Sequence, residues 1–251
     1  MPSLEVSEVT VTFGGRRALD GVAIAAEQGR VTGLIGPNGA GKSTLFDVIC
    51  GLRKPVAGRV ALDGKDVTRE GPARRARHGP ARRASHGMAR TFQRLELFGR
   101  LTVRENLMVA AEFSPEKRHA ASMTAKILDR LGLTEFADVP SDSLPTGTAR
   151  LVEVGRALAA RPRYLLLDEP AAGLDGDETE KFAVLLRSLA DREGVAILLV
   201  EHDMSLVMGT CDQVYVLDLG QVIISGTPAE VRRDERVLAA YLGTQAHGGA
   251  A

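Results

Sequence analysis

The feature that most constrains this chain is a glycine-rich loop between a short apolar segment and a helical one. Residues 31–35 are mostly apolar or β-branched, which predicts a buried strand, and residues 42–50 have a helical pattern. The loop fits the phosphate-binding consensus G-x-x-x-x-G-K-[ST], because it reads Gly36-Pro37-Asn38-Gly39-Ala40-Gly41-Lys42-Ser43. This order of strand, loop and helix predicts a site for nucleotide phosphates. A structural turn without a ligand is the alternative.

The residue types of this loop suit a bound triphosphate. Glycines let backbone N–H groups curve around phosphate oxygens, and the N-terminus of the next helix adds positive potential. We expect Lys42 to reach the β- and γ-phosphates, the Ser43 hydroxyl to bind Mg²⁺, and Thr44 to assist at the α-phosphate. The loop residues predicted to bind the nucleotide are Gly36, Asn38, Gly39, Gly41, Lys42, Ser43 and Thr44.

A pair of carboxylates follows a second apolar segment. Leucines at 165–167 lead into Asp168 and Glu169, which fits a Walker B motif. Asp168 would hold the metal ion directly or through water, and Glu169 would orient and deprotonate an attacking water. An acidic pair at this place can also simply begin a helix. Together with the loop at 36–43, the pattern favours the catalytic interpretation.

The remaining pattern predicts an α/β fold. Apolar segments at 164–167 and 195–200, separated by a helical stretch at 177–192, suit a parallel sheet covered on both faces. A more exposed antiparallel sheet is predicted at residues 4–12, 22–26 and 58–62. Helices are predicted in the middle of the chain at residues 103–111, 121–131 and 150–160, the last stopped by Pro162.

These elements predict one domain over residues 1–251 with internal divisions. Residues 1–93 and 162–243 would form the catalytic core with its antiparallel subdomain. Residues 94–161 would form an inserted helical subdomain, and residues 244–251 a flexible tail.

The composition excludes several classes of protein. Hydrophobic residues make up 44% and charged ones 25%, which rules out a disordered chain. The 32 basic and 32 acidic side chains cancel, which argues against a general nucleic-acid binder. Two distant cysteines, Cys50 and Cys211, indicate neither a zinc site nor disulfides and favour the cytosol. We expect no secretory signal and no membrane-spanning segment, so any transport role needs a partner that supplies the path.

An internal repeat of eight residues occupies positions 71–86. Residues 71–78 and 79–86 are identical at seven of eight positions. We interpret the repeat as a local duplication that lengthens a basic surface loop or helix, because charged stretches usually face solvent. A phosphate- or lipid-binding patch is the alternative.

Further residues, in the same order along the chain, resemble motifs of the nucleotide-binding subunit of ABC transporters. Phe13 lies where that family stacks an aromatic ring on adenine, and Gln93 matches the Q-loop, which touches the metal site and couples to the membrane partner. Asp175 ends a segment similar to the D-loop, and His202 matches the switch histidine that contacts the γ-phosphate. Taken singly, Phe13 could be a core aromatic, Gln93 a loop amide and His202 a capping or surface residue.

The signature segment of that family is altered here. Its usual Leu-Ser-Gly-Gly-Gln is replaced by Leu144-Pro145-Thr146-Gly147-Thr148. The resemblance implies that Thr146 and Gly147 contact ATP bound to the opposite subunit. Pro145 offers neither a hydroxyl nor an N–H group, so one hydrogen bond to phosphate is lost, although Thr146 could restore a hydroxyl nearby. Our hypothesis is that the site completed in the second subunit is weakened.

A finer resemblance is to the ATPase subunits of branched-chain amino-acid importers. It rests on residues 89–93, 97–98, 101–107, 168–174, 201–208, 226–230 and 240–243. Urea and short-chain amide importers use similar ATPases, so the resemblance does not identify the transported solute.

The resemblance implies a P-loop NTPase (RecA-like) fold and ATP hydrolysis with ATP and Mg²⁺ as cofactors. Glu169, His202 and Gln93 would be catalytic, and Ser43, Gln93 and Asp168 would bind the metal. The implied partners are a second ATPase subunit, identical or paralogous, transmembrane permease subunits and, indirectly, a solute-binding protein. A groove near Gln93 would receive a short helix of the permease, at the cytoplasmic face of the cell membrane.

Other classes fit less well. An ABC-type clamp on nucleic acid or ribosomes usually has two ATPase halves or a long coiled coil, and this sequence has one Walker A motif and neither addition. A regulatory module without hydrolysis is disfavoured by Glu169 and His202 but kept open by the signature. A GTPase or small-molecule kinase is disfavoured because the sequence has no guanine-reading Asn/Thr-Lys-x-Asp motif and holds a long insertion between its two nucleotide motifs.

Overall fold

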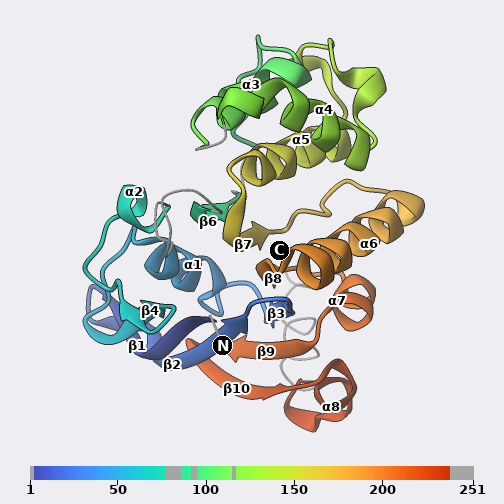
Figure 1. Cartoon of the computed structure of the whole chain (residues 1–251). Coiled ribbons are helices and arrows are strands. Elements are labelled where there is room, and N and C mark those ends of the chain that lie inside the picture. Colours follow the sequence, from blue (N-terminus) through green and yellow to red (C-terminus); the bar gives the residue numbers. More distant parts are fainter. Residues whose placement is uncertain (1–2, 77–85, 92–94, 115–116, 238–251) are drawn as a thin grey trace.

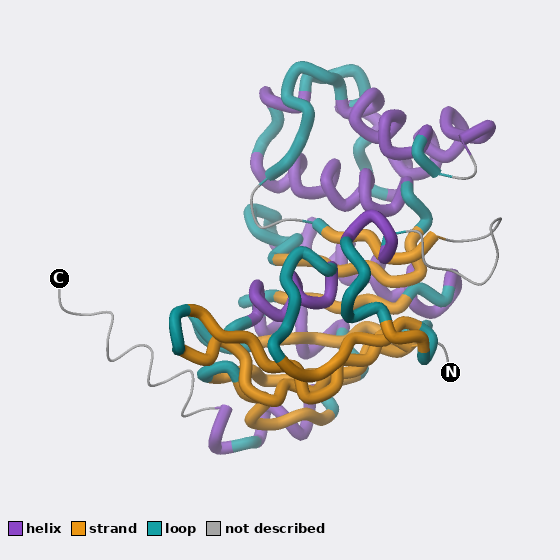
Figure 2. Tube along the Cα trace, turned by 90° about the vertical axis from the view of Figure 1, so that its left-hand side faces the viewer, coloured by secondary structure: helices purple, strands orange, loops and turns teal. Residues whose placement is uncertain are grey.

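Two β-sheets and several helices make up the part of the chain that the computed structural model describes, residues 3–76, 86–91, 95–114 and 117–237 (Figure 1). Most strands gather in one half of the molecule, and the helices of residues 103–159 lie apart from them (Figure 2). Within these residues, no helix is both long and apolar enough to cross a bilayer.

The first sheet is antiparallel and has the strand order β2-β1-β4-β5. Its strands are β1 (Ser3–Phe13), β2 (Arg16–Glu27), β4 (Ala57–Leu62) and β5 (Lys65–Asp66). Burial alternates along β1, because one face of the sheet packs on the core and the other meets solvent. The predicted antiparallel sheet is therefore confirmed, with longer strands than the sequence indicates.

The second sheet has the order β10-β9-β3-β8-β7-β6 and is parallel from β9 to β6. Its strands are β3 (Val31–Ile35), β6 (His86–Arg90), β7 (Pro162–Asp168), β8 (Ala196–Val200), β9 (Gln213–Asp218) and β10 (Gln221–Gly226). Every residue of β3, β7 and β8 is buried. Pro162 is the first residue of β7, so the predicted helix ends before it.

Helices cover both faces of this second sheet. Helix α1 (Lys42–Cys50) and the antiparallel sheet share a core with Leu166, whereas α6 (Gly176–Glu193) and α7 (Met204–Thr210) share the other core with Leu165 and Leu167. Successive residues of a strand point to opposite faces, and here both faces are apolar. This two-sided burial is why the sequence has continuous apolar segments, and it confirms the predicted α/β class.

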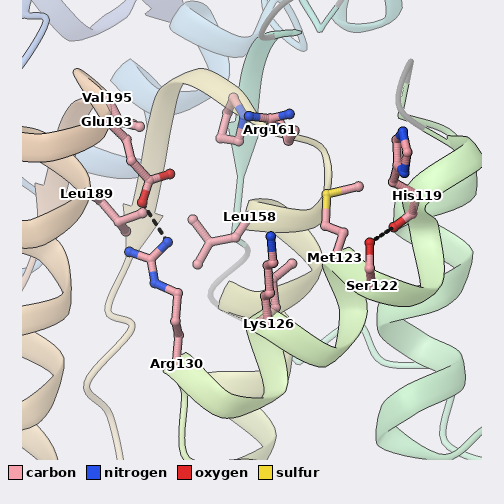
Figure 3. A pocket seen from close by; sticks show the side chains of 12 residues that line it. His119, Ser122, Met123, Lys126, Arg130, Leu158, Arg161, Leu189, Glu193 and Val195 are labelled. Atoms are coloured by element: carbon pink, nitrogen blue, oxygen red, sulfur yellow. Dashed lines mark hydrogen bonds and ion pairs between the residues drawn. The ribbon is translucent and has the colours of Figure 1, made fainter.

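The helical insertion contains α3 (Val103–Glu112), α4 (Ala120–Arg130) and α5 (Thr146–Ala159), with short 3₁₀ turns η1 (Lys117–His119), η2 (Thr134–Phe136) and η3 (Ser141–Ser143). Helix α5 begins at Thr146 rather than at 150, so the signature segment forms its first turn. The ion pair of Arg130 Nη1 and Glu193 Oε1, 2.6 Å apart, joins α4 to the end of α6 beside a cavity of about 530 Å³ (Figure 3).

Some elements escape the sequence analysis. The sequence pattern indicates neither the hairpin of β9 and β10 nor β6, the short helix α2 (Pro72–Arg75) or α8 (Pro228–Arg233). The interpretation of the repeat as a surface segment is wrong for Arg75, which is 1% exposed. Arg75 is buried because carbonyl groups surround its guanidinium. Residues 77–85 of the repeat and the predicted tail at 244–251 lie outside the described residues.

Candidate functional site

The glycine-rich loop leaves the end of β3 and enters α1. At Gly36, φ is +152° and a Cβ atom would lie 2.0 Å from the carbonyl oxygen of Leu217, so only glycine fits. Gly41 is left-handed and immediately precedes α1. We call the adjoining space of about 260 Å³ the P-loop cavity; it is lined by Ala18, residues 38–44, Asp168, Glu169, Val200 and His202.

The Lys42 ammonium group lies inside the loop. Its Nζ donates hydrogen bonds to the carbonyl oxygens of Gly36, at 2.6 Å, and Pro37, at 3.0 Å. Burial lowers the pKa of Lys42, while the nearby carboxylates of Glu169 and Asp168 act in the opposite direction. The loop thus holds a cation beside the carboxylates of the Walker B segment, where the terminal phosphates of a nucleotide would need it.

Asp168 is the last residue of β7 and is buried. Arg90 Nη2 lies 3.2 Å from Asp168 Oδ2, and Arg90 Nη1 lies 2.7 Å from Asp47 Oδ1 on α1. Burial raises the pKa of Asp168, and Arg90 opposes that shift. The carboxylate of Asp168 and the hydroxyl of Ser43 line the same cavity and are hard oxygen donors of the kind that Mg²⁺ prefers.

Glu169 and His202 come together at the end of the sheet. Strands β7 and β8 are parallel with Asp168 opposite Val200, so the residues that follow them leave from the same edge. Glu169 Oε1 lies 3.0 Å from His202 Nε2. Glu169 has a φ of +51°, an uncommon conformation for a non-glycine residue, and its N–H group donates to the carbonyl oxygen of Val200 at 2.9 Å.

Phe13 lies beside the P-loop cavity. Its ring is 45% exposed, with the Arg53 guanidinium 4.3 Å from the ring centre, so the alternative that it is a core aromatic is wrong. Phe13 lines a neighbouring cavity of about 470 Å³ that shares Ala18 and Gly39 with the P-loop cavity. An exposed ring in a cavity next to the loop is available to stack on a base.

The residues predicted to act on a second nucleotide lie elsewhere. Among the described residues that line the P-loop cavity, neither Thr146, Gly147 nor Asp175 is found. A Cβ atom at Gly147 would lie 2.5 Å from the carbonyl oxygen of Gly173, so glycine lets α5 approach the segment before α6. Asp175 caps α6 by accepting the N–H of Glu178 at 2.8 Å. Gln93 lies outside the described residues.

Two further residues at this site escape the sequence analysis. Arg90 belongs to the segment before Gln93, and Glu201 directly precedes His202. Glu201 is buried, and burial raises the pKa of its carboxyl group against the effect of backbone N–H donors. A carboxylate directly after an apolar strand is the signal that could have drawn attention to Glu201, as it does for Asp168.

The chain is similar to known sequence families over most of its length. The family described as "ABC transporter" matches residues 19–172, and the family "Branched-chain amino acid ATP-binding cassette transporter" matches residues 221–247. The high-affinity branched-chain amino acid transport ATP-binding protein BraF of Pseudomonas aeruginosa is 38% identical, over 96% of this chain and 98% of BraF.

Solved structures are also similar. The ADP conformation of MJ1267, an ATP-binding cassette of an ABC transporter, has a TM-score of 0.83 and 33% identity, covering 97% of this chain and 99% of the other. A dimeric post-hydrolysis state of the cassette MJ0796 bound to ADP and Pi has a TM-score of 0.75 and 26% identity, covering 90% and 98%.

Proposed function

The chain belongs to the ATP-binding proteins of ABC transporters, in their branched-chain amino acid family, and we propose that it powers the import of a branched-chain amino acid or a related small solute. It is an ABC ATPase, the ATP-binding subunit of a transporter whose cassettes dimerise and associate with permease subunits. We propose import as the direction of transport, a branched-chain amino acid or related small solute as the cargo, and the residue roles and subunit arrangement described below.

The observation that carries the residue roles is the convergence of three segments on the P-loop cavity. Lys42 and Ser43 lie where the glycine-rich loop enters α1. Asp168 and Glu169 lie at the end of β7, and His202 lies in the segment after β8. The loop amides and Lys42 would hold the phosphates of ATP, and Phe13 its adenine. Ser43 and Asp168, with Gln93, would bind Mg²⁺, which supplies charge neutralisation at the phosphate oxygens.

Glu169 and His202 form the pair that would act on the attacking water. The Glu169 carboxylate accepts the proton of a water aligned with the γ-phosphate. His202, when it carries its proton on Nε2, donates to Glu169 Oε1 across the 3.0 Å separation and so orients the base. His202 also lines the P-loop cavity, so it would contact the γ-phosphate and couple the base to it.

The assembly that we propose has two ATPase subunits, identical or paralogous, packed head to tail. Thr146 and Gly147 at the start of α5, with Asp175 at the start of α6, would complete the nucleotide site of the second subunit. We propose that each subunit divides into a core at 1–93 and 162–243 and a helical subdomain at 94–161. The helical subdomain would move against the core as the two subunits close on each other.

The proposed docking site for the permease lies beside Met88 and Arg90, on the strand that precedes Gln93 in the sequence. Leu52 and Met88 line a small cavity of about 180 Å³, and Leu52 is an exposed apolar side chain, as is Val56 four residues later in the sequence. A short helix of a permease would bury these side chains, and the protein would lie peripherally at the cytoplasmic face of the membrane. A solute-binding protein would act on the complex only through the permease.

The variant Glu169→Gln tests the proposed role of the base. It keeps the shape of the side chain but accepts a proton poorly, so ATP binding should persist while hydrolysis falls at least about tenfold. The measurements are ATP affinity, steady-state hydrolysis and size-exclusion chromatography with Mg²⁺ and ATP, in which the variant should accumulate as a dimer.

The matched control for this variant is Glu180→Gln, a residue on α6, which should behave as the unmodified protein. Near-normal turnover in Glu169→Gln would contradict its role as base. Absence of ATP binding by the unmodified protein, with no effect of Lys42→Ala, would contradict the whole assignment.

A further inference from the structure

A buried carboxylate lies between the two segments that carry Glu169 and His202. Glu201 is 4% exposed and directly follows β8. Its Oε1 accepts the backbone N–H of Ala171 at 2.8 Å, and its Oε2 accepts the backbone N–H of His202 at 3.1 Å. The two oxygens of one side chain therefore hold two separate parts of the chain, one after β7 and one after β8.

Burying a carboxylate is unfavourable unless hydrogen bonds replace its hydration. Here backbone N–H groups supply those bonds, and they favour the charged form against the effect of burial. Hydrogen bonds to a charged acceptor are stronger than neutral ones. Both backbone segments are consequently held more firmly than a neutral side chain would hold them.

The held segments are the ones that decide where Glu169 points. Glu169 occupies a left-handed conformation with a φ of +51° and is tied on its N-terminal side to the carbonyl oxygen of Val200. Ala171, two residues later, is tied to Glu201. A strained residue keeps its conformation only when its surroundings restrain it. On the C-terminal side of Glu169, the Ala172 N–H group donates to the Glu169 carbonyl oxygen at 3.3 Å, and Glu201 adds a second restraint through Ala171.

The same side chain also holds the other partner of the pair. Its Oε2 fixes the backbone of His202, whose Nε2 lies 3.0 Å from Glu169 Oε1. One carboxylate thus accepts hydrogen bonds from the backbone of both segments. A change at Glu201 would therefore alter the relative position of the base and the histidine without touching either side chain.

We propose that Glu201 is a positioning residue that clamps the segment after β7 to the segment after β8 and thereby sets the Glu169–His202 distance. It contacts backbone N–H groups and acts on hydrolysis only through that pair. The clamp also restrains the start of the segment that leads to Asp175, so it links the local site to the residues proposed to face the second subunit. The inference rests on the proposed roles of Glu169 and His202.

The test is a double-mutant cycle with Glu201→Gln and His202→Ala, measured by single-turnover ATP hydrolysis. The amide of Gln presents a donor to one of the two N–H groups, so the clamp opens on one side. We expect Glu201→Gln to lower the hydrolysis rate about tenfold or more, because small displacements of reacting groups have effects of that size. ATP affinity should stay within about twofold, since the contact is outside the loop that binds phosphate.

The diagnostic result is the effect of Glu201→Gln in the His202→Ala background. Because the clamp sets the Glu169–His202 distance, the rate there should fall by a clearly smaller factor than in the otherwise unmodified protein, where both members of the pair are displaced. A reduction by the same factor in both backgrounds, or an unchanged rate in the otherwise unmodified protein, would overturn the proposal. Glu201→Asp, which keeps the charge but cannot span both N–H groups, repeats the cycle if Glu201→Gln does not bind ATP.

Failure of this inference differs from failure of the proposed function. Normal hydrolysis by Glu169→Gln would remove the pair on which the clamp acts. Slow hydrolysis by Glu169→Gln together with independent effects of Glu201 and His202 would leave the proposed function intact and reject the clamp alone. Glu180→Gln serves again as the control.

Discussion

At the scale of single residues, a buried arginine fastens the end of α1 that lies opposite the phosphate loop. The Arg75 guanidinium donates to carbonyl oxygens at the C-terminus of α1 and in the connection before α2, namely those of Val48, Ile49, Val67, Thr68 and Glu70. The last carbonyl groups of a helix lack partners within it and carry partial negative charge. Arg75 meets both needs, although burial lowers its pKa.

Replacing Arg75 by Lys should destabilise the protein. A lysine has three donors on one nitrogen, so it leaves buried carbonyl groups unpaired, and the free energy of unfolding should fall by about 2–4 kcal/mol. Urea denaturation followed by circular dichroism measures the change. Arg74→Lys, at an exposed neighbour, is the control, and equal effects of the two changes would refute this account.

The residues of the site differ in how far the sequence predicts them. Lys42, Ser43 and Asp168 fall in motifs whose spacing is set by the chemistry, so the order of residue types is enough to predict them. Glu201 and Arg75 are not predicted, because their partners are backbone groups that only the fold brings near. A charged residue in a sequence gives no sign of whether carbonyl or N–H groups will surround it.

At the scale of elements, the described helices begin in two ways: α1, α2, α4 and α5 have no side-chain cap, and the others have one. Side chains of Thr102, Asp175, Asp203 and Thr227 cap α3, α6, α7 and α8. In the described part of the chain no side chain caps α5, whose preceding residue is Pro145. Helix α5 is proposed to face a second nucleotide. At its start, Pro145 replaces a serine whose hydroxyl would accept a hydrogen bond from the backbone N–H groups of α5 or donate one to a phosphate.

The variant Pro145→Ser separates these two uses. A serine cap should raise the free energy of unfolding by about 1 kcal/mol. If the hydroxyl also reaches the phosphate in the second subunit, ATP hydrolysis should rise about tenfold, as expected for one charge-assisted hydrogen bond. Thermal unfolding and ATPase rates are measured together. Higher stability with an unchanged rate would show that proline does not weaken the shared site.

Among the strands of the second sheet, the sequence predicts those whose burial is complete. The bounds of β3 and α1 match the prediction, and β7 and β8 are predictable because both faces of each strand are covered by apolar groups. Strands β9 and β10 begin with Gln and are partly exposed, so their pattern is weak. One of the two neighbours of β9 in the sheet is β3, which is far away in the sequence, and local patterns contain no information about that pairing.

At the scale of the whole molecule, each of the two hydrophobic cores contains one cysteine, so the reactivity of each thiol measures the packing of one core. Cys50 belongs to the core between α1 and the antiparallel sheet, and Cys211 to the core under α6 and α7. Burial raises the pKa of Cys50 to about 11 and that of Cys211 to about 12. Each thiol is therefore almost entirely protonated near neutral pH.

Alkylation with iodoacetamide should consequently be slow in the native protein. Because the thiolate is the reactive form and its fraction rises with pH up to the pKa, both rates near pH ~8 should be at least about a hundredfold below those of a model thiol peptide and should rise as the pH increases. Mass spectrometry of peptides gives each rate. Peptide-like reaction of either thiol in the folded protein would contradict the packing of its core.

One edge strand of the second sheet, β6, begins at the last residue of the octapeptide repeat. Strand β6 is outermost and has β7 as its neighbour in that sheet, with Arg90 opposite Leu166. The first copy of the octapeptide repeat contains α2 with Arg75, and the second copy ends at His86, the first residue of that strand. The second copy therefore adds eight residues to the sequence between Arg75, which fastens α1, and Arg90, which contacts Asp168. Because Arg75 and Met88 both line the cavity proposed to receive the permease, a bulky label inserted between them should hinder assembly of the transporter.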